Sequence, residues 1–362
     1  MLNNDLIDSL VITKSLKKES AKNILIIENE NIDLKSLIPE ISRKKAGNCF
    51  RSNQLISVVI TTCNRIDTLL KTLYGVMIQD YYNYEIIIVD DGTNNVTEEY
   101  FNSIEVDWIK YLKNNKNLGA SESRKKGYEN SNGDIIIFSD DDDYFIDNEY
   151  FTLLVSIFDN NNSVALICSN SLVYKKDEKV LCEVTFPDMQ QLSTKDYLNG
   201  FCLNYAKPNS SFTLALRKSN LNNIDFDRLH CFNDTSLYLY GLLSLGNVYF
   251  ISDYIGVYYI HNNNMSKKVN PEFIITNFES KKEIYIRAKE MNLLNHPSKW
   301  FYQQILNSAD YYFNGQSNGL SSDKKIILWG TINLVGHFRY LYTLKTFLLS
   351  IKAKIRLLIK GI

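Results

Sequence analysis

The sequence predicts an α/β protein with a doubly wound sheet, in which parallel strands alternate with helices on both faces. Runs with the composition of buried strands lie at 55–61, 85–89 and 134–138. A further strand is expected at 108–112. Apolar residues at helical spacing predict helices at 67–77 and 121–128. Further strands are expected at 164–168 and 248–251, and further helices at 236–245 and 270–313. Polar residues follow the early strands directly, and this carboxyl edge is where open α/β sheets bind ligands.

The composition is that of a globular protein with a packed core, since 45% of the residues are hydrophobic and 22% are charged. The formal net charge is −1, so no basic field predicts a nucleic-acid partner. The six cysteines show no metal-binding spacing, and residues 1–10 lack a signal-peptide pattern. No run reaches the roughly 18 apolar residues of a membrane span. We therefore expect a cytoplasmic protein with free thiols.

The strongest chemical signal is a run of four aspartates, Asp140 to Asp143, directly after a predicted buried strand. Adjacent carboxylates repel one another, and a divalent cation removes that repulsion. Mg²⁺ and Mn²⁺ take hard oxygen ligands, usually one or two carboxylates together with substrate phosphates. An acidic run in isolation is more often a solvated loop, but its place at a strand end favours a metal site.

A second acidic pair, Asp90 and Asp91, follows the strand at 85–89 and precedes Gly92, which permits a tight turn. These carboxylates have the chemistry to accept hydrogen bonds from a nucleobase or a ribose. Because Asp is also favoured at helix N-termini, the pair by itself leaves a capping role open.

Four segments together resemble family 2 glycosyltransferases in their order and spacing. They are Ile56 to Arg65, Val89 to Thr93, Asn117 to Ala120 leading to Arg124, and Asp134 to Asp143. The resemblance covers roughly residues 55–265 and implies a GT-A fold, a Rossmann-like mixed sheet with a nucleotide-binding half (55–145) and an acceptor half (146–265). Residues 1–54 are then an N-terminal extension, and 266–362 a helical C-terminal region.

The resemblance implies a binding site for a nucleotide-sugar. Asp90 and Asp91 would contact the nucleobase or the ribose, and Thr61 belongs to the same binding segment. Arg124 would lie near the diphosphate, because a guanidinium fork matches phosphate oxygens. The alternative for Arg124 is a surface position on a helix. Cys63 stands where relatives often place an aromatic residue that stacks on the base.

The resemblance also implies a divalent cation, Mn²⁺ or Mg²⁺. Asp142 would be the direct metal ligand, Asp140 would contact ribose or a metal-bound water, and Asp141 belongs to the same signature. His261 lies in a segment similar to the family's closing Tyr-Arg-x-His motif and would reach the metal or the leaving diphosphate. A lone histidine is more often structural, and Tyr259 replaces the usual arginine of that motif.

The family's catalytic base is usually the second acid of a Glu-Asp pair at the start of a helix. Here Asn233 replaces the first acid, so Asp234 would take the proton of the acceptor hydroxyl. The alternative is that Asp234 only caps the helix. Acceptor contacts are expected from residues 207–211.

These roles imply an inverting, metal-dependent hexosyl- or N-acetylhexosaminyltransferase. It would move a sugar from a nucleotide-sugar, with UDP as the default by resemblance, to a lipid-linked or polymeric glycan in bacterial surface polysaccharide synthesis. A sugar nucleotidyltransferase is an alternative, but it would show a Gly-rich phosphate loop, which Thr61 to Arg65 lacks. A non-catalytic nucleotide- or glycan-binding homologue is the other alternative. Asn233 and Cys63 favour it, and the intact acids argue against it.

The C-terminal segment 336–362 mixes Leu, Ile and Phe with Lys and Arg, and no acidic residue follows Asp323. A basic amphipathic helix of this kind can lie in a membrane interface, held by apolar burial and by anionic lipids. We therefore expect peripheral attachment to the inner face of the cell membrane, which suits a lipid-linked acceptor. Packing on the domain or a dimer contact is the alternative.

Overall fold

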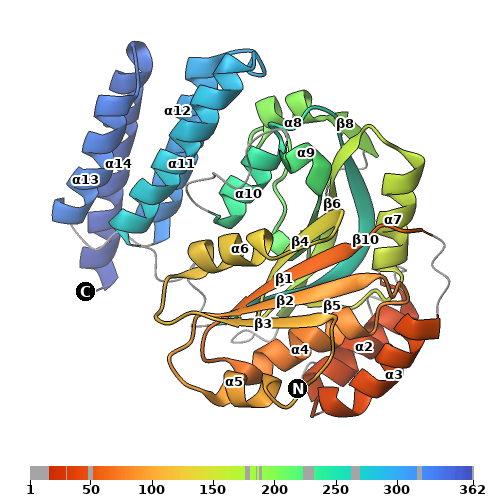
Figure 1. Cartoon of the computed structure of the whole chain (residues 1–362). Coiled ribbons are helices and arrows are strands. Elements are labelled where there is room, and N and C mark those ends of the chain that lie inside the picture. The colour runs from red at the N-terminus through yellow and green to blue at the C-terminus, as the bar shows by residue number, and fades with distance from the viewer. Residues whose placement is uncertain are drawn as a thin grey trace. The chain divides into compact units, whose positions relative to one another are not determined.

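One mixed sheet of ten strands contains all the strands expected from the sequence (Figure 1). The strands are β1 (Ile56–Thr62), β2 (Tyr84–Asp90), β3 (Ile109–Lys113), β4 (Ile135–Asp140), β5 (Tyr144–Phe145), β6 (Val164–Lys175), β7 (Val180–Val184), β8 (Gln191–Ser193), β9 (Leu214–Arg217) and β10 (Asn247–Ile260). Their order is β3-β2-β1-β4-β9-β6-β10-β5, with β7 beside β6 and β8 beside β10. The first four strands run parallel, and β9 is antiparallel to both of its neighbours, which makes the sheet mixed.

The structure is a computed structural model that describes residues 16–29, 31–47, 52–175, 180–184, 186, 190–222, 232–261, 270–315 and 320–360. These residues group into two compact units, one within 1–197 and 203–260, the other within 198–202 and 261–362. The first unit holds the sheet, and the second is helical. The domain boundary expected at 265–266 lies outside the described residues.

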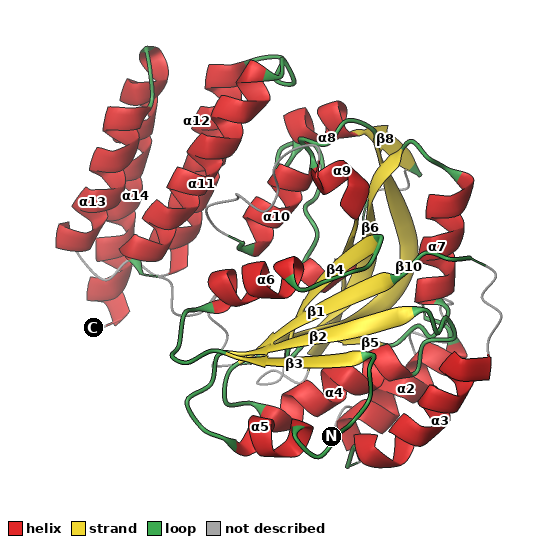
Figure 2. Ribbon diagram, in the orientation of Figure 1, coloured by secondary structure: helices red, strands yellow, loops and turns green. Residues whose placement is uncertain are grey.

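Helices cover both faces of the parallel part of the sheet (Figure 2). They include α4 (Ile66–Met77), α5 (Val96–Phe101), α6 (Ala120–Glu129) and α7 (Tyr150–Asn160). Successive side chains of a strand point to opposite faces. Val58 of β1 packs in one core with Leu73 of α4, whereas its neighbour Val59 lies against Gly127 of α6. The doubly wound arrangement predicted from the sequence is thus confirmed.

Two helices among the described residues before the first strand contribute to the core of the sheet unit. They are α2 (Lys18–Asn29) and α3 (Leu34–Gly47). Ile24 and Ile27 join the cluster around β5, β6 and β10, while Leu34, Ile38 and Ile41 join the larger cluster beneath β1 and β2. Burying one such side chain stabilises a fold by about 1.5–3 kcal/mol. The predicted N-terminal extension therefore contributes apolar residues to the core of this unit.

The described residues after β8 include the short helices α8 (Thr194–Gly200), α9 (Lys218–Asn222) and α10 (Asp234–Gly241). The second unit consists mainly of α11 (Pro271–Glu290), α12 (Pro297–Gly315), α13 (Leu320–Asn333) and α14 (His337–Lys360). The single helical span expected at 270–313 is two helices. Asn292 adopts a left-handed backbone (φ 55°) after α11, and Pro297 begins α12, where its missing amide hydrogen costs nothing. No described helix is long and apolar enough to cross a membrane.

Candidate active site

The carboxyl ends of β1, β2 and β4 meet at one edge of the sheet, as the sequence predicts. In the strand register Thr62 pairs with Asp90, and Thr61 pairs with Asp140. The Thr61 hydroxyl lies 3.3 Å from Asp140 Oδ1, and the Thr62 hydroxyl donates to Asp141 at 2.6 Å. Residues from two predicted motifs about eighty positions apart are therefore in contact.

Asp91 fixes the loop that leads into α6. Its carboxylate accepts the backbone N–H groups of Leu118 and Gly119, each at 2.7 Å, and the side-chain amide of Asn114 at 2.9 Å. Gly119 has φ +87°, a conformation that glycine adopts without strain. Asp91 is 4% exposed. It therefore has structural partners that sequence reasoning did not foresee.

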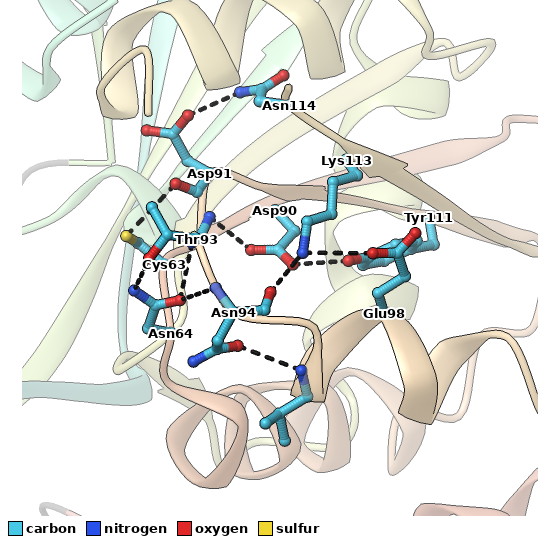
Figure 3. Close-up of polar contacts among 12 residues, drawn as sticks. Cys63, Asn64, Asp90, Asp91, Thr93, Asn94, Glu98, Tyr111, Lys113 and Asn114 are labelled. Carbon is cyan, nitrogen blue, oxygen red and sulfur yellow. Dashed lines mark hydrogen bonds and ion pairs between the residues drawn. The ribbon is translucent and has the colours of Figure 1, made fainter. Parts of the chain in front are cut away.

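Asp90 is held in a similar way at the end of β2. It accepts the N–H of Gly92 at 2.7 Å and the hydroxyl of Tyr111 at 2.6 Å, and Lys113 Nζ lies at 3.4 Å (Figure 3). Burial and the bond to Asp90 raise the pKa of Tyr111. Tyr111 and Lys113 both come from β3, the strand beside β2. The predicted contacts of Asp90 and Asp91 with a nucleobase or ribose stay predictions.

Asn64 ties the turn after β1 to the turn after β2. It has φ 57°, and its side-chain oxygen accepts the N–H groups of Thr93 and Asn94 at 3.0 and 3.1 Å. A Cβ atom on Gly92 would lie only 2.6 Å from that oxygen, so the turn requires glycine. Cys63 Sγ lies 3.4 Å from the side-chain amide of Asn117. The half-buried thiol thus faces this same pair of turns.

The four aspartates after β4 do not form a solvated loop, because Asp141 and Asp143 are fully buried and Asp142 is 8% exposed. Arg65 pairs with two of them, at 2.5 Å from Asp141 Oδ1 and 2.9 Å from Asp142 Oδ2. Burial raises the pKa of Asp141 to about 7, and Arg65 opposes that shift. Arg65 is a site residue that sequence reasoning missed. Its position in the turn after β1, at the same sheet edge as the acids, was the available signal.

Asp143 joins two segments that lie far from it in the sequence. The Ser210 hydroxyl donates to its carboxylate, and so does the backbone N–H of Tyr259 at 3.2 Å. Burial and the neighbouring acids raise its pKa well above the usual range. Ser210 belongs to the segment expected to contact the acceptor. The structure places that segment beside the acidic run.

Arg124 is buried between two of the predicted site residues, which excludes the surface position considered for it. Its Nη2 atom lies 2.6 Å from Asp140 Oδ1, and its Nη1 atom lies 3.0 Å from Asp234 Oδ1. The same Nη1 donates to the carbonyl of Phe232 at 2.9 Å. Its Nε atom is buried and makes no hydrogen bond within the described residues. Burial raises the pKa of Asp140, and Arg124 opposes this.

Asp234 is not the cap of α10. Asn233 fills that position, since its side chain accepts the N–H of Ser236 at 2.9 Å. Asp234 is the first residue of the helix, with its Oδ1 buried against Arg124. The side chain as a whole remains 37% exposed. Its other oxygen is therefore the one that can reach a ligand.

Two predicted metal residues lie in different units. Asp142 belongs to the sheet unit, whereas His261 directly follows β10 and is the first residue of the stretch 261–362 in the helical unit. Among the described residues, no three His, Cys, Asp or Glu side chains converge as a ligand set for a metal ion. The roles of Asp142 and His261 as ligands stay predictions.

Comparisons with known proteins agree with this geometry. The family model described as Glycosyl transferase family 2 matches residues 57–223. The chain is 27% identical over 189 residues to a GalNAc(5)-diNAcBac-PP-undecaprenol beta-1,3-glucosyltransferase of Campylobacter jejuni, covering 51% of this chain and 58% of that protein. It is 34% identical over 87 residues to the Escherichia coli UDP-Glc:alpha-D-GlcNAc-diphosphoundecaprenol beta-1,3-glucosyltransferase WfaP, covering 24% and 35%.

A solved structure shares the fold. Residues 1–349 of S. aureus TarS, in complex with UDP-GlcNAc, superpose with a TM-score of 0.58 at 16% identity, covering 81% of this chain and 89% of that one. The chain therefore has the fold of GT-A-type glycosyltransferase structures. Residues 57–223 match the model of glycosyltransferase family 2, the family that the sequence segments resemble.

Proposed function

We propose that the protein moves a sugar from a nucleotide-sugar, a UDP-sugar in the simplest case, to a lipid-linked or polymeric glycan of a bacterial surface. One observation carries the proposal: Arg124 joins Asp140, at the predicted donor site, to Asp234, the predicted base, at 2.6 and 3.0 Å. A donor and an acceptor bound at these two carboxylates would lie close together. The names of the Campylobacter and Escherichia relatives, both acting on undecaprenyl-linked sugars, support the acceptor class.

The donor site would use the edge formed by β1, β2 and β4. Asn64 and Asp91 fix the turns after β1 and β2. The nucleotide would bind next to these turns, beside Cys63 and the end of β2. The unpaired Nε of Arg124 is a buried donor with a positive charge. Such a group suits a phosphate oxygen, because burial strengthens a charge-assisted hydrogen bond.

The acidic run fits a divalent cation by its chemistry. Asp140 and Asp142 offer only carboxylate oxygens, and Mg²⁺ or Mn²⁺ commonly takes one or two of these together with substrate phosphates. A cation bound there supplies positive charge that stabilises the departing nucleoside diphosphate. The protein's own cations, Arg65 and Arg124, already hold the neighbouring carboxylates in place.

Asp234 would act as the general base of a single displacement with inversion. Oδ2 would accept the proton of the acceptor hydroxyl while that oxygen bonds to the anomeric carbon and the bond to the diphosphate breaks. Arg124 pairs with Oδ1 and so orients the carboxylate. One carboxylate is sufficient for this chemistry, so Asn233 is free to cap the helix.

The test uses the purified full chain with UDP-, GDP- and dTDP-sugars, in Mn²⁺ and in EDTA. We expect calorimetric binding of one donor that requires the metal, with slow hydrolysis of that donor. Asp234→Asn should keep donor binding and lower transfer to an undecaprenyl-diphosphate glycan by about 100-fold or more. Asp310→Asn, at an exposed position of the helical unit, is the matched control. Absence of binding to every donor would favour a non-catalytic homologue.

A further inference from the structure

Exposed large apolar side chains are concentrated on the last two helices. Twelve of the nineteen among the described residues lie between positions 328 and 359. They are Leu328, Ile332, Val335, Tyr340, Leu341, Leu344, Phe347, Leu348, Ile351, Ile355, Leu358 and Ile359. We call these residues the apolar face. Soluble proteins rarely expose so many large apolar residues together unless the surface binds something.

Helix α14 packs with its polar side inward. The residues buried against the rest of the helical unit are Tyr342, Thr346, Ser350 and Ala353, each at most 4% exposed. The opposite side carries Leu344, Leu348, Ile351 and Ile355, spaced four, three and four residues apart, at 39% to 58% exposure. At about 3.6 residues per turn these four form one stripe along the helix.

Specific contacts hold α14 in this orientation. The ring of Tyr342 packs against Gly330 of α13, and its hydroxyl donates to the carbonyl of Ile326 at 3.0 Å. Ser350 donates to the buried carboxylate of Asp323 at 2.5 Å. Rotating the helix to bury its leucines would break both contacts and leave Asp323 without the Ser350 hydroxyl. The apolar stripe of α14 is therefore turned away from the rest of the helical unit.

The charged residues of α14, and those of α13 after Asp323, have one sign, although Glu272 and Glu279 of α11 contact Lys325 and Trp329 of α13. Residues 324–362 contain eight Lys and Arg and no Asp or Glu. Lys345 and Lys352 are exposed and follow Leu344 and Ile351 directly, so they lie beside the stripe. Arg356 is engaged differently, since it donates to the carbonyls of Phe313 and Asn314. Lysines beside an apolar stripe can place their stems along the hydrocarbon and their ammonium groups among headgroups.

We propose that the apolar face of α13 and α14 docks on the surface of an anionic lipid bilayer. The apolar side chains would enter the boundary of the acyl chains, and the neighbouring lysines would contact lipid phosphates. A second copy of the chain is a poorer partner, since a two-fold contact would set basic surface against basic surface. The inference goes beyond the proposed reaction and holds whichever sugar is transferred.

The experiment measures co-sedimentation of the full chain with vesicles, without donor or acceptor, so that a failed transferase assay cannot affect it. We expect binding to vesicles of equal parts phosphatidylglycerol and phosphatidylcholine, and at least tenfold weaker binding to phosphatidylcholine alone. Leu344→Glu with Leu348→Glu should weaken the anionic binding at least tenfold. Leu245→Glu, at an exposed leucine of the sheet unit (71% exposed), should leave it unchanged.

A second pair of variants keeps the test independent of folding. Lys345→Glu with Lys352→Glu reverses the charge of two exposed lysines, and the Nζ atom of Lys345 also lies 5.8 Å from the centroid of the Tyr302 ring. This variant should weaken binding to anionic vesicles at least tenfold, with a melting temperature close to that of wild type. Equal binding by wild type and both double variants would overturn the proposal. So would a change in sedimentation coefficient on Leu344→Glu with Leu348→Glu in a protein that binds no vesicles, which would identify a contact between copies.

Discussion

At the end of β2, Asp90 and Asp91 accept hydrogen bonds mainly from backbone amides and neutral side chains, with one lysine at 3.4 Å. At the end of β4, three aspartates are paired with two guanidinium groups, those of Arg65 and Arg124. Both acidic segments begin at the last residue of a buried parallel strand, and in sequence they look alike. The two groups of aspartates differ in the side chains and backbone groups that bind their carboxylates.

The two ends of the sheet differ in whether a metal ion or a substrate can replace the present partners of the carboxylates. Backbone N–H groups cannot leave Asp91 unless the loop at 114–119 moves, so this end of the sheet is fixed when the fold forms. A guanidinium on a side chain that is 36% exposed can leave Asp142 by rotating, and a metal ion or a substrate can take its place. We infer that the end of β2 shapes the site and that the end of β4 carries its exchangeable charge.

The largest effect should come from removing the exchangeable charge. Asp142→Ala deletes the predicted metal ligand, and we expect turnover of the nucleotide-sugar to fall about 100- to 1,000-fold. Stability should change little, because Arg65 still pairs with Asp141. Turnover and urea unfolding of the same preparation measure both. Undiminished turnover would show that the acidic run has no catalytic role.

The reverse pattern is expected at the end of β2. In wild type the two carboxylate oxygens of Asp91 accept the N–H groups of Leu118 and Gly119. In Asp91→Asn one of these oxygens becomes an NH₂ group, which cannot accept, and the remaining amide oxygen is a weaker acceptor. We expect a loss of about 2–3 kcal/mol in the free energy of unfolding, measured in urea. A variant of normal stability that had lost only nucleotide binding would place Asp91 among exchangeable ligands instead.

The role of Arg65 as an exchangeable cation can be tested by Arg65→Gln. The variant leaves buried Asp141 without its counter-ion, and because the arginine is partly exposed we expect a loss of only about 1–2 kcal/mol in EDTA. Mn²⁺ should restore more stability to the variant than it adds to wild type. Melting temperatures with and without Mn²⁺ measure this, and an equal metal effect in both proteins would contradict it.

The sequence was sufficient for the strands and their acidic ends because both signals are local: an aliphatic run and the acids directly behind it. It was not sufficient for the partners of those acids. Arg65 and Tyr111 reach Asp141 and Asp90 only after strands pair in register, and that pairing has no local signature. The same holds for α14. An amphipathic pattern shows that the helix has an apolar side, but contacts such as Ser350 with Asp323 decide that this side is exposed and the other side buried.

The smallest effect is expected from removing a single donor to Asp90 at the end of β2. Tyr111→Phe removes one of the donors to Asp90 and leaves the N–H of Gly92 and the nearby ammonium of Lys113 in place. We expect a loss of about 1 kcal/mol in the free energy of unfolding and unchanged turnover, because a single neutral donor contributes about that much. Urea unfolding and initial rates are the measurements. A tenfold loss of turnover at normal stability would mean that Asp90 itself contacts the donor and that Tyr111 orients it there.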